Sequence, residues 1–273
     1  MKITQTKAPP APRGGRFKTL RILILLLALL IVAVSTCEDR YRTTRWREPL
    51  FVAVYPIAAD ASPVTKGYVA GLNAEHFQPI DRFFAREAAR YHLALALPVK
   101  TRLRAELLEM PPQRADDDGV LRTIWWSLRL RYWAWHVSGQ SREPEDIRLF
   151  VLYHDPKLTP TVPHSLGLSK GQIGVVYAFA ADWMNGANDV VIAHEMLHTL
   201  GATDKYNAAD DSPRFPDGYG DPRQVPLYPQ RHAELMAGRR MLAADRWEQA
   251  TDLDEVVIGE ATALEIRWPA LMR

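Results

Sequence analysis

Two histidines and a glutamate in the second half of this 273-residue chain have a spacing that suits metal chemistry. His194 and His198 are four residues apart, so on an α-helix both imidazoles project from one face and can reach a single ion. Glu195 follows the first histidine directly, which places its carboxylate beside the ligands, where it can accept a proton from a metal-bound water. The order of these residues therefore predicts a hydrolytic metal site on a helix.

The residues that follow the second histidine extend the pattern. Gly201 stands where a helix needs a left-handed residue in order to end, and Asp204 lies three positions further on. The break lets the chain turn back, so that the Asp204 carboxylate can become a third ligand. Two alternatives stay open: Asp204 can cap the loop instead, and a third ligand can come from Glu260 or, on weaker grounds, from Glu234.

The complete pattern, His-Glu-x-x-His-x-x-Gly-x-x-Asp, resembles the zinc signature of the metzincin peptidases in the form that ends in Asp, as in the snapalysin group. Tyr206 continues the resemblance, and Glu-Leu-Met-Ala-Gly at 234–238 resembles that group's Met-turn. The specific resemblance covers the segments 188–206 and 232–239 only. The site that it implies consists of the Zn²⁺ ligands His194, His198 and Asp204, the general base Glu195, and the supporting residues Gly201, Tyr206 and Met236.

The resemblance also implies a fold and a substrate. The fold is an α+β domain, metzincin-like, with a mixed twisted β-sheet, an active-site helix, a Met-turn whose Met236 forms an apolar floor beneath the metal, and a C-terminal helix. The predicted strand at 171–180 is expected to be the sheet edge that binds an extended peptide by strand addition. The implied activity is hydrolysis of peptide or protein substrates; a catalytically silent, zinc-stabilised, membrane-tethered binding module is the alternative, and a non-peptide amidase is a third option.

Periodicity and breaker residues place these motifs in a run of strands and helices typical of an α+β domain. The metal-binding pattern lies on a predicted helix at 188–200, with Asn188 or Asp189 as its N-cap. The region 205–230, with five prolines and four aspartates, is predicted to be irregular. The other predicted elements are strands at 50–57, 147–153 and 171–180 and helices at 75–95, 120–137 and 252–268.

The predicted helix at 120–137 is rich in large apolar side chains. One face carries Leu121, Ile124, Trp125, Leu128, Tyr132 and Trp135. Packing in the core is the favoured interpretation of this face, and a membrane-surface or ligand-binding role is the alternative.

Other groups that could bind metal lack a recognisable spacing. Three isolated histidines are interpreted as surface or hydrogen-bonded residues: His154, His164 and His232. Four acids of the irregular region are interpreted as a solvated loop, with Ca²⁺ binding as the alternative: Asp210, Asp211, Asp217 and Asp221.

The N-terminus has the layout of an export or anchoring signal. Residues 1–21 carry six cations and no acid, and an uninterrupted apolar run follows at 22–34. An uncleaved anchor, a lipoprotein signal that uses Cys37 and a cleaved signal peptide all remain open, and all three place the rest of the chain outside the cytoplasm. The predicted division is a basic N-terminus at 1–21, a membrane segment at 22–37, a linker at 38–48 and a zinc peptidase domain at 49–273.

Composition excludes two classes of site. The net charge is only +2, so no strong field for nucleic acid is implied. Because Cys37 is the single cysteine, an intramolecular disulfide and a cysteine-based zinc site are both excluded.

Overall fold

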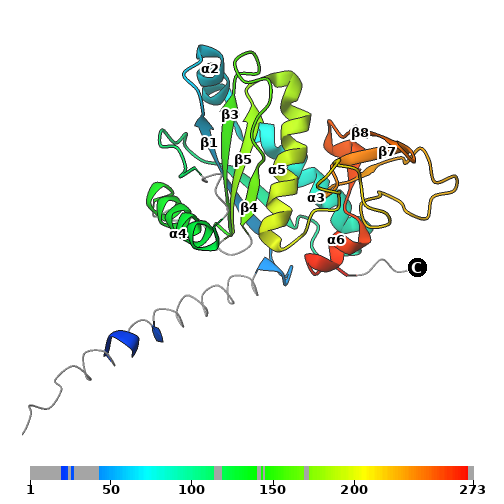
Figure 1. Cartoon of the computed structure of the whole chain (residues 1–273), viewed down its shortest axis with the longest axis horizontal. Coiled ribbons are helices and arrows are strands. Elements are labelled where there is room, and N and C mark those ends of the chain that lie inside the picture. Colours follow the sequence, from blue (N-terminus) through cyan, green and yellow to red (C-terminus); the bar gives the residue numbers. More distant parts are fainter. Residues whose placement is uncertain are drawn as a thin grey trace, which may run out of the picture. The chain divides into compact units, whose positions relative to one another are not determined.

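A computed structural model describes residues 20–23, 26–27, 43–113, 119–139, 143, 145–168 and 172–269. The chain divides into two compact units, Met1–Asp39 and Arg40–Arg273, and the second carries the fold drawn in Figure 1. Most of the basic N-terminus predicted at 1–21 and of the membrane segment predicted at 22–37 lies outside the described residues. Within the described residues, no helix is both long enough and apolar enough to cross a membrane.

The second unit is built on a five-stranded sheet with the strand order β2-β1-β3-β5-β4. Four strands are parallel, namely β1 (Leu50–Ala58), β2 (Val99–Leu103), β3 (Ile147–His154) and β5 (Ile173–Phe179). The short strand β4 (Leu166–Leu168) pairs with β5 in the antiparallel direction. The sheet is therefore mixed, as the sequence predicted for an α+β domain.

Helices cover both faces of this sheet (Figure 1). Alternate residues of β1 belong to two separate core clusters, as a strand buried on both faces requires. One cluster joins the sheet to α2 (Pro63–Gly71), α3 (Gln78–Arg90) and α5 (Asn185–Leu200), and the other joins it to α4 (Val120–Val137). Short 3₁₀ turns precede α3 and α5, at Ala74–Phe77 and Asp182–Met184.

A second, smaller sheet follows the irregular region, with the strand order β8-β7-β6-β9. Its strands are β6 (Ala233–Glu234), β7 (Arg239–Ala243), β8 (Arg246–Gln249) and β9 (Val256–Val257). The helix predicted at 252–268 is wrong, because a 3₁₀ turn (Leu253–Glu255), β9 and the short α6 (Glu260–Glu265) occupy this segment. Two adjacent β-branched valines pair with β6, and Gly259 then separates them from α6.

Three further predictions need correction. The helix predicted at 75–95 ends at Arg90, well before Pro98. The helix that carries His194 and His198 begins at Asn185 instead of 188, and the Asn188 side chain bonds both the N–H and the carbonyl of Phe179 at the end of β5. The strand predicted at 171–180 is not the sheet edge, because β4 lies outside it.

The aromatic face of α4 was also assigned to the wrong environment. The side chains that α4 buries against the sheet are Trp126, Leu130, Trp133 and Ala134, and the face predicted to be core is exposed. The helix is apolar on nearly all sides, so periodicity alone could not choose which face packs.

Part of the predicted linker at 38–48 packs on the domain. Trp46 is buried, its indole N–H donates to the Ile266 carbonyl at 2.7 Å, and its ring packs edge-on against Trp268. The N- and C-terminal ends of the second unit therefore hold each other in place.

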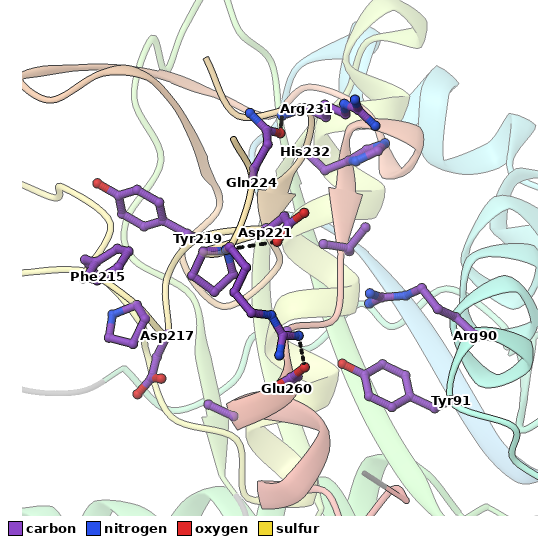
Figure 2. Close-up of a pocket in the computed structure, with 17 residues that line it drawn as sticks. Arg90, Tyr91, Phe215, Asp217, Tyr219, Asp221, Gln224, Arg231, His232 and Glu260 are labelled. Carbon is purple, nitrogen blue, oxygen red and sulfur yellow. Dashed lines mark hydrogen bonds and ion pairs between the residues drawn. The ribbon is translucent and has the colours of Figure 1, made fainter. Parts of the chain in front are cut away.

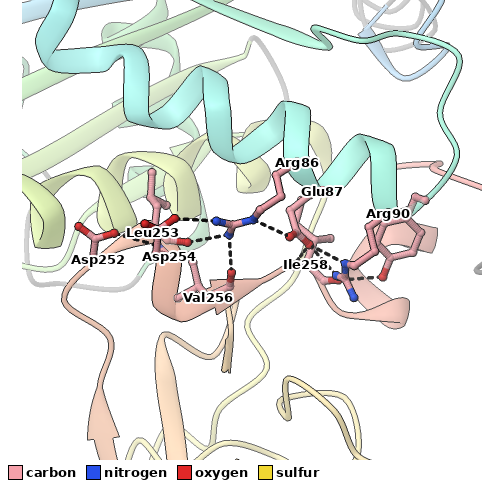
Figure 3. Close-up of polar contacts among 9 residues, drawn as sticks. Arg86, Glu87, Arg90, Asp252, Leu253, Asp254, Val256 and Ile258 are labelled. Atoms are coloured by element: carbon pink, nitrogen blue, oxygen red, sulfur yellow. Dashed lines mark hydrogen bonds and ion pairs between the residues drawn. The ribbon is translucent and has the colours of Figure 1, made fainter. Parts of the chain in front are cut away.

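A buried glutamate fastens the C-terminal segment to α3 (Figure 3). Glu87 is 1% exposed and accepts hydrogen bonds from the Arg90 guanidinium at 2.6 Å and from the Ile258 N–H at 2.8 Å. Arg86 donates to the carbonyls of Leu253 and Val256 at 2.8 and 3.0 Å. Through these bonds α3 holds the strand β9 in place, and β9 pairs with β6.

A second buried acid, Asp189 on α5, makes stability depend on pH. Burial, together with the negative charge of the nearby Asp252, raises its pKa to about 7. The folded state therefore holds a proton that the unfolded chain releases, so this acid reduces stability as pH rises from about 4 to about 7.

The replacement Asp189→Asn is expected to be more stable than wild type above pH 7, by at most about 4 kcal/mol for a shift of three pKa units. The difference should vanish below about pH 3, where the carboxyl is protonated in both states. Chemical denaturation across this range measures it, with the exposed Asp182→Asn as control. A gain in stability that does not change with pH would contradict the explanation.

Candidate metal centre

The helix α5 carries the predicted metal-binding pattern and ends as predicted. Gly201 has a φ of 103°, and its N–H donates to the His198 carbonyl. The next N–H, of Ala202, donates to the Leu197 carbonyl at 3.0 Å. This left-handed ending reverses the chain, so that Asp204 returns to the side of the helix that bears the histidines.

Three polar atoms of these residues converge on one point. The Nε2 atoms of His194 and His198 are 3.0 Å apart. The Asp204 Oδ1 atom lies 3.2 Å from the first and 3.1 Å from the second. The three residues that the sequence predicted as ligands are thus together.

The remaining nitrogen of each imidazole has a backbone partner. The Nδ1 atom of His194 lies 3.0 Å from the Leu235 carbonyl, and that of His198 lies 2.9 Å from the Ala202 carbonyl. A carbonyl only accepts, so Nδ1 must carry the proton in both rings. In the neutral form of each ring, Nε2 therefore directs a lone pair at the shared point, which is the tautomer that metal ligation needs.

Glu195 completes the cluster. Together with the two histidines it forms a group of ligand atoms that could hold a metal ion, all within 4.8 Å of one another. Its side chain is 5% exposed, and its Oε2 atom has no hydrogen-bond partner in the described part of the chain. A buried carboxylate oxygen without a partner is costly unless a cation or a bound water satisfies it, which fits a metal site.

Burial and charge shift the protonation of this group. Burial raises the pKa of Glu195. Burial alone would lower the pKa of His198, but the hydrogen bond to Asp204 and the charge of Glu195 outweigh it and raise that pKa. Burial would raise the pKa of Asp204, and the two histidines reverse this and hold it well below its usual range. Asp204 is therefore a carboxylate at neutral pH, as a ligand must be.

The loop that bears Asp204 is fastened to the Met-turn segment at 234–238. The Lys205 N–H donates to the Met236 carbonyl at 3.0 Å, and its buried ammonium group binds Glu265 at 2.6 Å. Met236 itself is fully buried in the core cluster that includes Met196 of α5. The turn thus holds both His194, through Leu235, and the Asp204 loop.

Glu234, the weaker alternative ligand, has a different place. It is fully buried and accepts hydrogen bonds from the N–H groups of Ala237 and Gly259, each at 3.1 Å, and from the Thr262 hydroxyl at 2.7 Å. These bonds fix the Met-turn segment and connect it to α6.

Glu260, the other alternative, lines a separate hollow of about 630 Å³ (Figure 2). It pairs there with Arg223. His232 and Asp217 line the same hollow. Among the described residues, the only group that could hold a metal is the one on α5, so Glu260 and the four acids of the irregular region do not form a second one.

The converging atoms lie at the bottom of a hollow of about 310 Å³. Sequence reasoning named Tyr206 in its wall but missed Tyr177, Arg239 and the exposed His164. Arg239 pairs with Asp211 at 2.9 Å and lies over the Tyr206 ring. Its position directly after the Met-turn segment was the signal that could have identified it. His154 instead stacks on Tyr177 at the end of β3.

The edge strand β4 lies directly on the metal-binding helix. A Cβ atom at Gly167 would come within 2.4 Å of the His198 Cβ and 2.6 Å of the Glu195 carbonyl oxygen. Glycine at this position therefore allows the strand to pack directly on α5, and the residues just before it, 162–165, line the hollow.

No protein-family model matches this chain, and a search of curated proteins found no match either. The geometry of the site is thus the basis for a functional conclusion.

Proposed function

We propose that this protein is a zinc-dependent metallopeptidase of metzincin type. The convergence of His194 Nε2, His198 Nε2 and Asp204 Oδ1 beside the buried Glu195 carries the proposal. Tetrahedral zinc ligands at about 2.0–2.1 Å stand roughly 3.3 Å from one another, close to the separations seen here. Three protein ligands leave one position open, which is typical of catalytic zinc.

Each residue has a role in peptide hydrolysis. Bound zinc supplies Lewis-acid polarisation of a water and of the peptide carbonyl. Glu195 accepts the proton of that water and returns it to the leaving amine, for which its raised pKa is suited. The carbonyl partners of the two Nδ1 atoms orient both imidazoles, so that each Nε2 faces the shared point.

Three features of the fold support the metzincin resemblance. The helix ends at Gly201 in the left-handed conformation that the pattern implied, and the segment 234–238 forms a turn beside His194. The sheet has an edge strand next to the site, although this strand is β4. The outer edge of β4 offers backbone groups to which an extended peptide can pair.

We place the site outside the cytoplasm, with residues 22–37 as membrane segment or export signal. The basic residues of 1–21 and the apolar run at 22–34 support this placement. A catalytically silent zinc module is the second candidate, and the unpartnered Oε2 atom of Glu195 argues against it, since a binding module needs no general base.

Metal content and peptide cleavage of the full chain test the proposal. One zinc per chain and hydrolysis of members of a diverse peptide library are expected. Zinc binding without any cleavage would favour the silent module, and failure to bind zinc would overturn both candidates.

The replacement Asp204→Ala is expected to weaken zinc binding by more than about 100-fold, the upper end of what loss of an outer-shell partner costs. The reason is that Asp204 supplies the only anionic ligand of the proposed set. Competition with a chromophoric chelator measures the affinity, and His232→Ala removes a histidine outside the cluster as the matched control. If the affinity for zinc is unchanged, Asp204 is not a ligand and caps the loop instead.

The replacement Gly167→Ala tests the role of β4. The added methyl group forces the strand off α5, so hydrolysis is expected to fall by about 10- to 100-fold, as a displacement near 1 Å can cause. Gly67→Ala is the control, because nothing lies within 4 Å of its added carbon. Steady-state kinetics should show the loss in kcat/KM at unchanged zinc content. If Gly167→Ala keeps full activity, β4 does not take part in substrate binding.

A further inference from the structure

The helix α4 presents a large apolar face to solvent. Trp125 and Trp135 are 64% and 65% exposed, and four more large side chains on this face are at least half exposed: Leu121, Ile124, Leu128 and Tyr132. Scattered exposed apolar residues are ordinary in soluble proteins, but a contiguous face of six on one helix marks an interaction surface.

Exposed cations lie along one flank of this apolar face. On a helical projection they are Arg122, Arg129 and His136, whereas Arg131 on the other flank is half-buried. Tyr132 stacks on the His136 ring, with 6.2 Å between ring centroids. Leucines at the centre of a helix face, with tryptophan and tyrosine on either side and arginines on an adjoining flank, are typical of helices that lie in a membrane interface.

A neighbouring loop enlarges the apolar surface. The indole N–H of the buried Trp126 donates to the Pro112 carbonyl at 2.8 Å, which holds the loop against α4. Between loop and helix lies a hollow whose wall includes Met110, Trp125 and Tyr132. Leu108 of the same loop is almost fully exposed.

Thr43, near the start of the second unit, lies close to the first residue of β5, a strand on which α4 packs. Thr43 accepts a hydrogen bond from the Gln172 amide at 2.7 Å, and Ile173, the next residue, belongs to the core cluster of α4. Figure 1 shows α4 at this end of the sheet and α2 at the other. Five residues lie between Cys37 and Thr43, so the chain that joins them can span at most about 22 Å.

We propose that the exposed face of α4 lies on the surface of a membrane that contains anionic lipid. The apolar side chains enter the boundary between headgroups and acyl chains, and the arginines meet lipid phosphates. A second copy of the same face explains the apolar side chains but would bring the arginines of both copies together. The argument from the distance between Cys37 and Thr43 depends on the proposed membrane segment. The argument from the side chains of α4 depends neither on that segment nor on the zinc peptidase proposal.

This orientation has a consequence for the metal centre. The helices α4 and α5 pack against opposite faces of the main sheet. With α4 on the bilayer, the main sheet separates α5, which carries His194 and Glu195, from the lipid.

Site-specific fluorescence in reconstituted vesicles tests the proposal. A single cysteine at position 125 (Trp125→Cys with Cys37→Ser in the full chain) carries an environment-sensitive nitrobenzoxadiazole label. Trp183→Cys is the matched control, because Trp183 is an even more exposed tryptophan (76%) beside α5. In vesicles of phosphatidylcholine and phosphatidylglycerol, doxyl-labelled lipid should quench the label at 125 and leave that at 183 unquenched.

A charge reversal tests the role of anionic lipid. Arg129→Glu is expected to reduce the ratio of docked to undocked protein about fivefold or more, and Arg82→Glu on the exposed side of α3 should leave it unchanged. Equal quenching at 125 and 183 would overturn the proposal. A label at 125 that is shielded without lipid, in proportion to protein concentration, would overturn it in favour of a second copy.

Discussion

Replacing Glu195 with Gln is expected to reduce peptide hydrolysis by about 10²- to 10⁴-fold while zinc stays bound. Gln keeps the size of the side chain and an oxygen that can accept a hydrogen bond from water. It cannot take the proton, so the step that generates hydroxide loses its base. The ligand atoms His194 Nε2, His198 Nε2 and Asp204 Oδ1 are untouched by the change, which is why metal content should not fall.

The matched control is Asp189→Asn, which neutralises another buried acid on the same helix. It lines no part of the hollow that contains the histidines and should retain full activity. The measurements are kcat/KM on a peptide substrate and zinc per chain. If Glu195→Gln hydrolyses peptide at the wild-type rate, Glu195 is not the general base. If it loses its zinc as well, the glutamate supports the metal instead.

The positions of His194, His198 and Asp204 could be predicted from sequence, because residues close to them in the chain determine these positions. Helical spacing determines how His194 and His198 project, and a glycine at the helix end determines where Asp204 returns. The supporting contacts are long-range, and nothing in the local pattern indicates them. The bond from His194 to the Leu235 carbonyl spans 41 residues, and that from Glu87 to Ile258 spans 171.

The errors in the predicted elements also have physical causes. The strand β4 has only three residues, one of them glycine, so it lacks the alternation by which a strand is recognised. Its position at the sheet edge is set by contact with α5 at Gly167. The face of α4 was misassigned because apolar residues occupy both its buried and its exposed sides. An exposed apolar face is expected where a partner, here proposed to be lipid, replaces the core.

The network around Glu87 gives the largest expected loss of stability. Glu87→Ala should reduce the free energy of unfolding by about 3 kcal/mol, the lower end for breaking a buried ion pair, because both arginines keep contact with water. The Ile258 N–H would also lose its acceptor in a buried position.

Comparison with Asp254→Ala isolates the effect of burial. Asp254 binds Arg86 at 2.7 Å but is 89% exposed, so its removal should cost less than about 1 kcal/mol. Chemical denaturation measures both, and Glu87→Gln should fall between them, because an amide oxygen can still accept from Ile258. Since β9 is the strand that pairs with β6, which begins the Met-turn segment, Glu87→Ala should also loosen zinc binding before global unfolding. Equal stability losses for Glu87→Ala and Asp254→Ala would mean that the C-terminal segment is held by its apolar contacts alone.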